Sequence, residues 1–363
     1  MNLFRALVAF VVLNHDSGKC WGSAALWYSA KYCKGGGISS WFSYLLPEVG
    51  LLYQRLLENY KMKVSRVINV LMVALVLLVA CAAPAPKEIV IGMTVPGLQF
   101  PFFVIMKEEA DAAAAKLGVK IVFVDAQNDS AKQAAAVEGF VAQKVSAILI
   151  SPMTVDSLVP SIEAAVAAGI PVATVARKAN TDKVLIHVGA DNVEGGRAAA
   201  RFIIEKLGGK GSVIELEGTP GASPAIDRKK GFDEVIATSG VKIIVSQTAE
   251  FNRAKGNSVM ENLMQAYPDF DAVFGANDEM IIGAIEAMSS AGVDPKSKVT
   301  AGFDATPDAF AYMKDGRLGA TIDQYPGQQA GKALEVLVDY IKNKKTPPES
   351  VVFISPKAVT TAP

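Results

Sequence analysis

DAVFGAND at residues 271–278 is the first of three similar segments, and KVTAGFD at 298–304 and LGATIDQ at 318–324 follow it. Each segment is a short apolar run through Val, Phe, Ile or Ala, as in a buried β-strand. Helical patterns at 279–290 and 307–314 separate the three segments. The stretch therefore predicts a βαβαβ unit with parallel strands.

The three segments end in polar side chains, which are those of Asn277, Asp304 and Gln324. In parallel sheets of this type, ligands bind outside the carboxyl ends of the strands. Donors and acceptors on three successive strand ends are therefore predicted to surround one crevice, which suits a polyhydroxylated ligand. Asn277 and Asp304 could instead cap the helices that follow them, but three polar strand ends in succession favour a binding site.

Composition and charge exclude several classes of protein. Lys and Arg total 36, as do Asp and Glu, so no charge excess indicates a nucleic acid or an acidic membrane surface as partner. Three cysteines exclude a disulfide framework.

The first 61 residues differ from the rest of the chain, because they contain all three tryptophans and two of the three cysteines without any alternation of strand and helix patterns. From Met62 the sequence is similar to a bacterial lipoprotein signal peptide. Lys63 and Arg66 precede an apolar run at 67–80, and small residues lead to Cys81. This run is shorter than the roughly 20 residues that a membrane-spanning helix needs.

We therefore predict that translation starts at Met62 and that residues 1–61 are an extension outside the true coding region. Residues 62–81 are predicted to be a signal peptide with a lipidated Cys81, and 82–87 a tether. The protein is then expected in the periplasm or at the cell surface, with a lipid anchor as its only attachment to the membrane.

From residue 88 onward, strand and helix patterns alternate in two similar series. The first series has predicted strands at 88–93, 119–125, 146–150, 170–175 and 184–189. The second has predicted strands near 211–216, 241–247, 271–275, 298–303 and 318–322, and a last strand pattern, VVFI, lies at 351–354. Two such series predict an α/β fold of two doubly wound lobes.

Catalytic chemistry has little support in the sequence. The region after the signal pattern has one histidine, His187, which lies inside an apolar strand pattern and is interpreted as structural. Nucleophile-elbow, zinc-protease and phosphate-loop motifs are not found, and no base is placed beside a nucleophile. We therefore predict a binding protein without catalytic residues, cofactor or metal site.

Aromatic and planar charged residues follow several strands instead. FPFF at 100–103 opens the first helix after a strand, where Pro101 suits the helix start. Phe251 and Arg177 also follow strands, and Arg228 lies at a helix start, where it opposes the helix dipole. Aromatic faces at a crevice stack on the C–H faces of sugar rings, while guanidinium and amide groups bind hydroxyls. FPFF could alternatively be a buried hydrophobic staple.

Many separated motifs resemble the ribose-binding protein family, the type I periplasmic binding proteins that deliver sugars to ABC importers. These motifs are PFF at 101–103, DAQND at 125–129, GADNVEGG at 189–196, AEFNRAKG at 249–256, GANDEM at 275–280, GFDATPD at 302–308 and TIDQ at 321–324. The resemblance covers essentially all of residues 88–363. It implies a monomer of two Rossmann-like lobes that close on a monosaccharide and are recognised by a permease.

The family's three crossing strands imply the lobe boundaries. The N-terminal lobe is expected at 88–190 and 325–350, and the C-terminal lobe at 191–324 and 351–363. The crossings, which act as a hinge, are expected near Ala190-Asp191, Gln324-Tyr325 and residues 350–353.

The resemblance also implies ligand contacts, in which Phe102 and Phe103 stack on one face of the sugar and Phe251 on the other. The implied polar contacts are Arg177, Arg228, Asn277, Asp304 and Gln324. Three positions depart from the pattern of the ribose binders. Phe100 and Ser151 stand where those proteins have Asn, and Ala176 stands where they have Asp before the arginine.

These departures leave several ligands open. A deoxysugar lacks the hydroxyl that would otherwise be unpaired, a sugar acid could direct its charge to Arg177, and water could fill the space for a neutral pentose or hexose. From the sequence we rank the neutral or deoxygenated monosaccharide ahead of the acid. A receptor that presents a sugar or signal molecule is also compatible with the sequence, whereas a repressor with this core would need a DNA-binding segment in place of the signal pattern.

Overall fold

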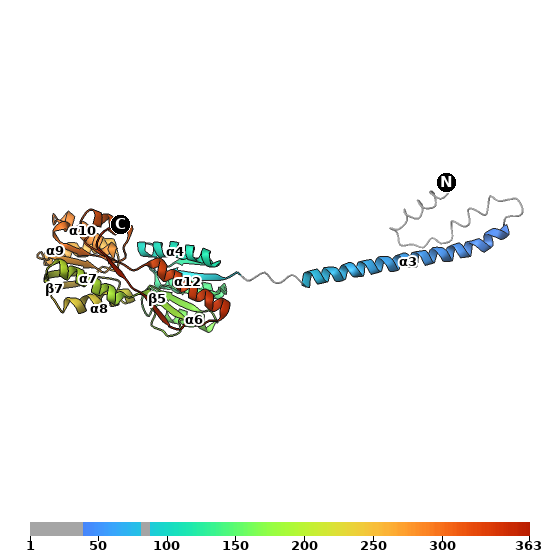
Figure 1. The fold of residues 1–363 in the computed structure, drawn as a ribbon, viewed down its shortest axis with the longest axis horizontal. Helices are drawn as coiled ribbons and strands as arrows, with labels where there is room; N and C mark the ends of the chain where they lie inside the picture. Colours follow the sequence, from blue (N-terminus) through green and yellow to red (C-terminus); the bar gives the residue numbers. More distant parts are fainter. Residues whose placement is uncertain (1–38, 81–87) are drawn as a thin grey trace. The chain divides into compact units, whose positions relative to one another are not determined.

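The computed structural model of the chain describes residues 39–80 and 88–363, which belong to two separate units, Met1–Ala85 and Pro86–Pro363. In the first unit, α3 (Ser39–Ala80) is a continuous helix of 42 residues (Figure 1). It extends through both the expected extension and the apolar run of the expected signal peptide, and Cys81 lies outside the described residues.

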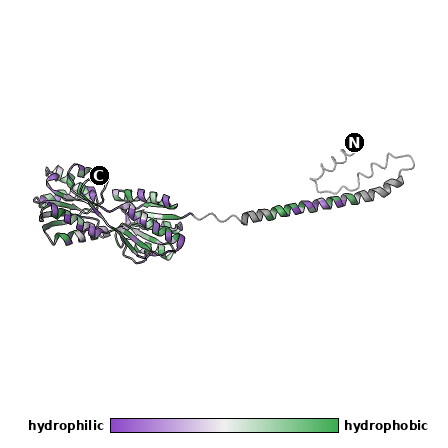
Figure 2. Ribbon diagram, in the orientation of Figure 1, coloured by the Kyte–Doolittle hydropathy of each residue, from purple (hydrophilic) through white to green (hydrophobic). Residues whose placement is uncertain are grey.

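Hydrophobic and hydrophilic residues are interspersed along the described side chains of α3 (Figure 2). Among the described residues, no helix combines the length and the apolar character that crossing a membrane requires.

The second unit begins with a lobe built on a six-stranded parallel sheet in the order β11-β5-β4-β3-β1-β2. Its strands are β1 (Val90–Val95), β2 (Lys120–Asp125), β3 (Ala147–Ile150), β4 (Val172–Val175), β5 (Ile186–Ala190) and β11 (Val351–Ile354). Its helices are α4 (Pro101–Leu117), α5 (Ser130–Ala142), α6 (Val159–Ala167) and α12 (Pro326–Asn343). Strands β3, β4 and β5 are buried at every residue, as expected for parallel strands covered on both faces.

The second lobe has a four-stranded parallel sheet in the order β7-β6-β8-β9. Its strands are β6 (Lys210–Glu217), β7 (Gly240–Thr248), β8 (Ala272–Gly275) and β9 (Val299–Ala301). Its helices are α7 (Asn192–Lys206), α8 (Ser223–Ile236), α9 (Arg253–Ala266), α10 (Asp278–Ser290), the short 3-10 helix η1 (Pro295–Ser297) and α11 (Pro307–Lys314).

The segment at 318–324 pairs differently from the two segments at 271–278 and 298–304. Strands β8 and β9 are parallel neighbours, as predicted. Strand β10 (Thr321–Asp323) pairs antiparallel with β12 (Lys357–Val359), and a single bridge between Ala301 and Ala320 links this segment to β9. The sequence gives no signal for β12, since that strand has only three residues.

The chain passes between the lobes at three places (Figure 1). The first lies between β5 and α7 and the second between β10 and α12, where Ala190-Asp191 and Gln324-Tyr325 were predicted. The third lies between β11 and β12 and not at 350–353. Because β11 pairs with β5, residues 351–354 belong to the sheet of the first lobe, and their assignment to the second lobe is wrong.

Close packing of α7 against α8 positions the second lobe's side of the cleft between the lobes. A Cβ atom on Gly196 would lie 2.1 Å from the Arg228 carbonyl oxygen, and one on Gly231 would lie 1.9 Å from the Val193 carbonyl oxygen. Glycine is therefore required at both contacts, and the two helices approach closely enough for side chains of one to bond those of the other.

Candidate functional site

A cleft between the two lobes contains about 370 Å³ of empty space, counting the part that is open to solvent. The first lobe contributes Phe100, Phe102, Phe103, Ala176 and Arg177. The second lobe and the crossing after β10 contribute Pro224, Arg228, Phe251, Asn277, Asp304 and Gln324. Nine of the ten residues predicted as ligand contacts lie here. Ser151 is absent from this lining, and its side chain is fully buried.

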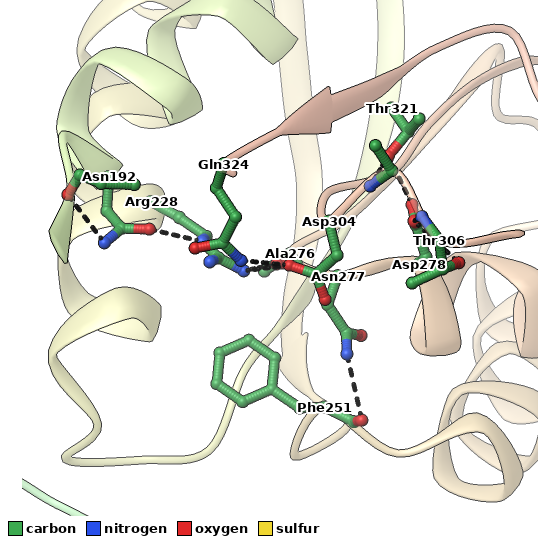
Figure 3. A network of polar contacts seen from close by, with 12 residues as sticks. Asn192, Arg228, Phe251, Ala276, Asn277, Asp278, Asp304, Thr306, Thr321 and Gln324 are labelled. Carbon is green, nitrogen blue, oxygen red and sulfur yellow. Dashed lines mark hydrogen bonds and ion pairs between the residues drawn. The ribbon is translucent and has the colours of Figure 1, made fainter. Parts of the chain in front are cut away.

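Arg228 is fixed by contacts within the second lobe (Figure 3). Its Nε donates to Asn192 Oδ1 at 2.9 Å, and its Nη1 donates to the Ala276 carbonyl oxygen at 2.7 Å. The guanidinium carbon lies 3.6 Å from the centroid of the Phe303 ring, and Nη1 lies 3.5 Å from Asp304 Oδ1. The guanidinium therefore has a single orientation in the cleft.

Asn192 was not predicted as a site residue. Its position two residues after β5 is the signal that could have identified it, because it is a buried polar residue near a strand end like Asn277. It acts on the site through Arg228, to which it presents its amide oxygen.

Asp304 is the carboxylate of the cleft. It follows β9 with a φ of 116°, and Oδ1 accepts a hydrogen bond from Gln324 Nε2. Gln329 Nε2 in turn donates to the Gln324 backbone oxygen at 2.6 Å. Burial raises the pKa of Asp304, while the nearby Arg228 and the Gln324 hydrogen bond lower it. The carboxylate is thus positioned by Arg228 on α8 and by Gln324 directly after β10.

Asp278 supports the position of Asp304 and Gln324, and it was also not predicted from the sequence. Its Oδ2 accepts from the Thr306 amide at 2.8 Å, and its Oδ1 accepts from Thr321 Oγ1 at 2.7 Å (Figure 3). Burial, followed by the proximity of Asp304, raises the pKa of Asp278. One carboxyl group therefore holds together the loop after β9 and the strand that leads to Gln324.

The capping alternative is confirmed for Asn277 and wrong for Asp304. Asn277 Oδ1 accepts from the Met280 amide at 3.0 Å and caps α10, while Nδ2 donates to the Phe251 carbonyl oxygen at 3.2 Å. Helix α11 is capped by Thr306 instead. Asn277 therefore lines the cleft and caps a helix at the same time.

Arg177 is held by a different set of contacts. Its Nη1 donates to the Met153 carbonyl oxygen at 2.8 Å, and its guanidinium lies over the rings of Phe103 and Phe251, 5.4 and 5.6 Å from their centroids. Gln133 Oε1 accepts from the Met153 amide at 3.0 Å and thereby fixes the carbonyl that Arg177 binds. Burial and the neighbouring Arg228 lower the pKa of Arg177.

His187 lies outside the cleft lining and is buried in β5, with Nδ1 3.0 Å from Thr174 Oγ1. Burial, with a smaller effect of Lys178, lowers the pKa of His187 to about 3. These contacts agree with its interpretation as a structural residue. In residues 39–80 and 88–363, no group of three or more His, Cys, Asp and Glu residues could hold a metal ion.

Residues at the rim of the cleft form hydrogen bonds and an ion pair between the two lobes. The Lys178 amide donates to Ser223 Oγ at 2.8 Å, and Lys178 Nζ lies 3.0 Å from Asp227 Oδ2. On the neighbouring loop, the Val155 amide donates to the Gly221 carbonyl oxygen at 2.9 Å. These contacts join the two lobes directly, next to Arg177 and Pro224 of the cleft lining.

Known proteins share this fold and much of this sequence. The model of the periplasmic binding protein domain family matches residues 91–345. The ribose import binding protein of Bacillus subtilis (strain 168) is 43% identical over 287 residues, which cover 76% of this chain and 93% of that protein. The galactofuranose-binding protein of Escherichia coli (strain K12) is 36% identical over 277 residues, which cover 74% and 86%.

Solved structures of similar proteins have the same fold. The periplasmic binding protein of the arabinose ABC transporter from Shewanella sp. ANA-3, bound to α- and β-L-arabinofuranose, superposes with a TM-score of 0.72 at 34% identity. That match covers 75% of this chain and 91% of that one. The predicted fold of two doubly wound lobes is therefore confirmed.

Proposed function

The chain belongs to the periplasmic binding protein family, and on that premise we propose that it is an extracytoplasmic substrate-binding protein of an ABC importer that binds a monosaccharide between its lobes. The observation that carries the proposal is the composition of the cleft. Aromatic rings of both lobes line it, together with guanidinium, amide and carboxylate groups that are fixed by bonds within the protein. Such a combination suits a sugar ring, which has apolar faces and a polar edge.

Eight of the ten predicted contact residues have a role in this proposal. Phe102 and Phe103 stack on one face of the sugar, and Phe251 stacks on the other. The hydroxyls on the second-lobe side bind to the polar group that comprises Arg228, Asn277, Asp304 and Gln324. Phe100 closes the first-lobe side as an apolar wall.

Binding and closure are coupled in this mechanism without any chemical step. The ligand contacts both lobes only when they are closed, so it shifts an equilibrium between open and closed forms toward the closed one. The crossings at Ala190-Asp191 and Gln324-Tyr325 act as the hinge. The permease then recognises the closed form.

A thermal-shift screen of the full chain against pentoses, hexoses, deoxysugars, polyols and sugar acids tests the proposal. A ligand at about 100 times its dissociation constant should add about 2.7 kcal/mol to the free energy of unfolding. Asp304→Asn should abolish the shift, whereas Asp308→Asn, at an exposed carboxylate outside the cleft lining, should preserve it. A screen without any stabilising sugar, polyol or sugar acid would rule the function out.

The membrane attachment is a separate proposal that rests on the sequence pattern at 62–81. We propose that Cys81 is lipidated and anchors the protein outside the cytoplasm. Cys81→Ala should release the protein from the membrane or leave it unprocessed, and expression from Met62 should give the same anchored product as the full chain. Mass spectrometry of native protein that still carries residues 1–61 would contradict the predicted processing.

A further inference from the structure

The charges in the cleft do not balance. Arg177 and Arg228 are both buried, with 5% and 3% of their surface exposed, and Asp304 is the one carboxylate in the lining. Asp304 lies 3.5 Å from Arg228 and also accepts from Gln324. Within residues 88–363, no Asp or Glu oxygen lies within 4.0 Å of an Arg177 nitrogen. The cleft therefore holds one positive charge more than it holds negative charges.

The contacts of Arg177 compensate its burial only in part. A guanidinium has five N–H donors, and the hydrogen bond to the Met153 carbonyl oxygen satisfies one of them. The rings of Phe103 and Phe251 attract the cation, but this attraction is weaker than the penalty for removing a charge from water. Burial also lowers the pKa of this group. Arg177 therefore has N–H donors without an acceptor in the protein, and an anionic group of the ligand can bind to them.

The residue before Arg177 explains the imbalance. Ala176 lines the cleft with a left-handed φ of 60°, a conformation that Asp and Asn adopt more readily than Ala. The resemblance to ribose binders implies an Asp at this position. The backbone would accept that Asp, so its absence removes a negative charge from the cleft without any structural need.

A deoxysugar and a sugar acid have opposite consequences for Arg177. A deoxysugar matches the apolar Ala176 and Phe100 but leaves the guanidinium unpaired in a closed cleft. A carboxylate on the ligand would occupy the side that Ala176 leaves open and could accept two parallel N–H bonds. An unpaired buried charge costs more than an unpaired buried hydroxyl, which reverses the order that the sequence alone favoured.

We propose that the ligand is a sugar acid, an aldonate or a uronate, whose carboxylate binds Arg177 while its hydroxyls bind Arg228, Asn277 and Asp304. This inference rests on the proposed function. It assigns to Ala176 the role of selecting the charge of the ligand.

Isothermal titration of the full chain with matched compounds tests this selection. The sets are galacturonate, galactose and fucose, then glucuronate and glucose, and finally ribonate and ribose. At least one acid should bind at least about tenfold more tightly than its neutral and deoxygenated counterparts. Ala176→Asp supplies the missing carboxylate and should reverse that ratio, whereas Ala176→Asn has a similar shape without charge and should change the ratio less than Ala176→Asp does.

Arg177→Gln gives a second, independent measurement, and it should remove the preference for the acid even if Ala176→Asp does not fold. Thermal unfolding of each ligand-free variant identifies any change in stability. A wild-type protein that binds a neutral or deoxygenated sugar at least as tightly as every acid would overturn the inference and leave the proposed function intact. If none of the compounds binds, the inference fails, and the broader thermal-shift screen decides whether the proposed function fails with it.

Discussion

Arg228 and Arg177 show how differently two buried arginines of one cleft are supported. Arg228 bonds Asn192 and the Ala276 carbonyl oxygen, pairs with Asp304 and covers the Phe303 ring. Arg177 has one hydrogen bond within the protein. The first is thus part of the scaffold as well as the site, while the second is mainly available to the ligand.

Replacing Arg228 is therefore predicted to affect both folding and binding. Arg228→Ala leaves Asp304 buried without its partner, which should lower the free energy of unfolding by about 3–5 kcal/mol and abolish sugar binding. Urea unfolding of the ligand-free protein measures the first effect, and titration calorimetry the second. Lys230→Ala, on the exposed side of the same helix, is the control and should change neither. Loss of binding at unchanged stability would mean that the ion pair contributes nothing to the fold.

His187 gives a prediction for pH dependence. Its pKa is about 3 in the folded protein and 6.5 in the unfolded reference. Between these values the unfolded state binds the proton and the folded state does not, so stability falls as the pH drops below 6.5. At about pH 5 the loss should be about 2 kcal/mol.

Urea unfolding at about pH 5 and about pH 7.5 checks this value. The decrease in wild type should exceed that in His187→Gln by about 2 kcal/mol, because glutamine does not titrate and can still bond Thr174. Equal decreases in the two proteins would show that His187 is protonated in the folded state.

At the residue scale, the sequence predicted side chains that lie at strand ends but not the contacts between them. Asn277 and Asp304 could be identified from the end of an apolar run. Asn192 also follows a strand and could be identified by that position, but its bond to Arg228 could not be predicted. The bonds of Asp278 to Thr306 and Thr321 could not be predicted either, because both partners lie on other elements.

At the scale of elements, alternation of strands and helices predicted both parallel sheets, but not the membership of short strands. The pattern VVFI at 351–354 is equally compatible with either lobe, and only its pairing with β5 decides between them. Strand β12 has only three residues, which are too few side chains for a period to be visible. Strand β10 was predicted from the run at 318–324, but its pairing with β12 depends on the tertiary position of the crossings.

The contact between α7 and α8 gives a prediction at this scale. Gly231→Ala places a Cβ atom 1.9 Å from the Val193 carbonyl oxygen, so the two helices must move apart. We expect the free energy of unfolding to fall by about 1–3 kcal/mol and sugar affinity to decrease, since Arg228 and Asn192 lie on opposite sides of this contact.

Gly139→Ala is the matched control for Gly231→Ala. Gly139 also lies inside a helix, α5, but the nearest atom to an added Cβ is the Gln143 side-chain nitrogen at 3.9 Å. This variant should gain about 0.5–1 kcal/mol from helix propensity. Chemical denaturation of both variants measures their free energies of unfolding. A Gly231→Ala protein that is as stable as Gly139→Ala would contradict the close contact between α7 and α8.

At the scale of the whole molecule, closure has to be reversible, so the direct bonds between the lobes are few and lie at the rim. Lys178 makes two of them, to Ser223 and to Asp227. The ion pair is partly exposed, with side-chain exposures of 37% and 21%, which limits its contribution to about 0–1 kcal/mol. Most of the free energy of closure must then come from the ligand.

This division predicts a modest kinetic effect of the rim. Lys178→Met removes the ion pair of the closed form while its backbone bond to Ser223 remains. The dissociation rate of the sugar should rise by up to about fivefold, and the association rate should stay unchanged because the open form lacks this pair. Lys183→Met removes an exposed pair inside the first lobe, with Asp182, and should change neither rate. Stopped-flow measurements of the dissociation rate at low and high salt test this prediction. High salt screens the ion pair, so the wild-type rate should approach that of Lys178→Met. Equal rates for wild type and Lys178→Met at low salt would show that closure does not depend on this contact.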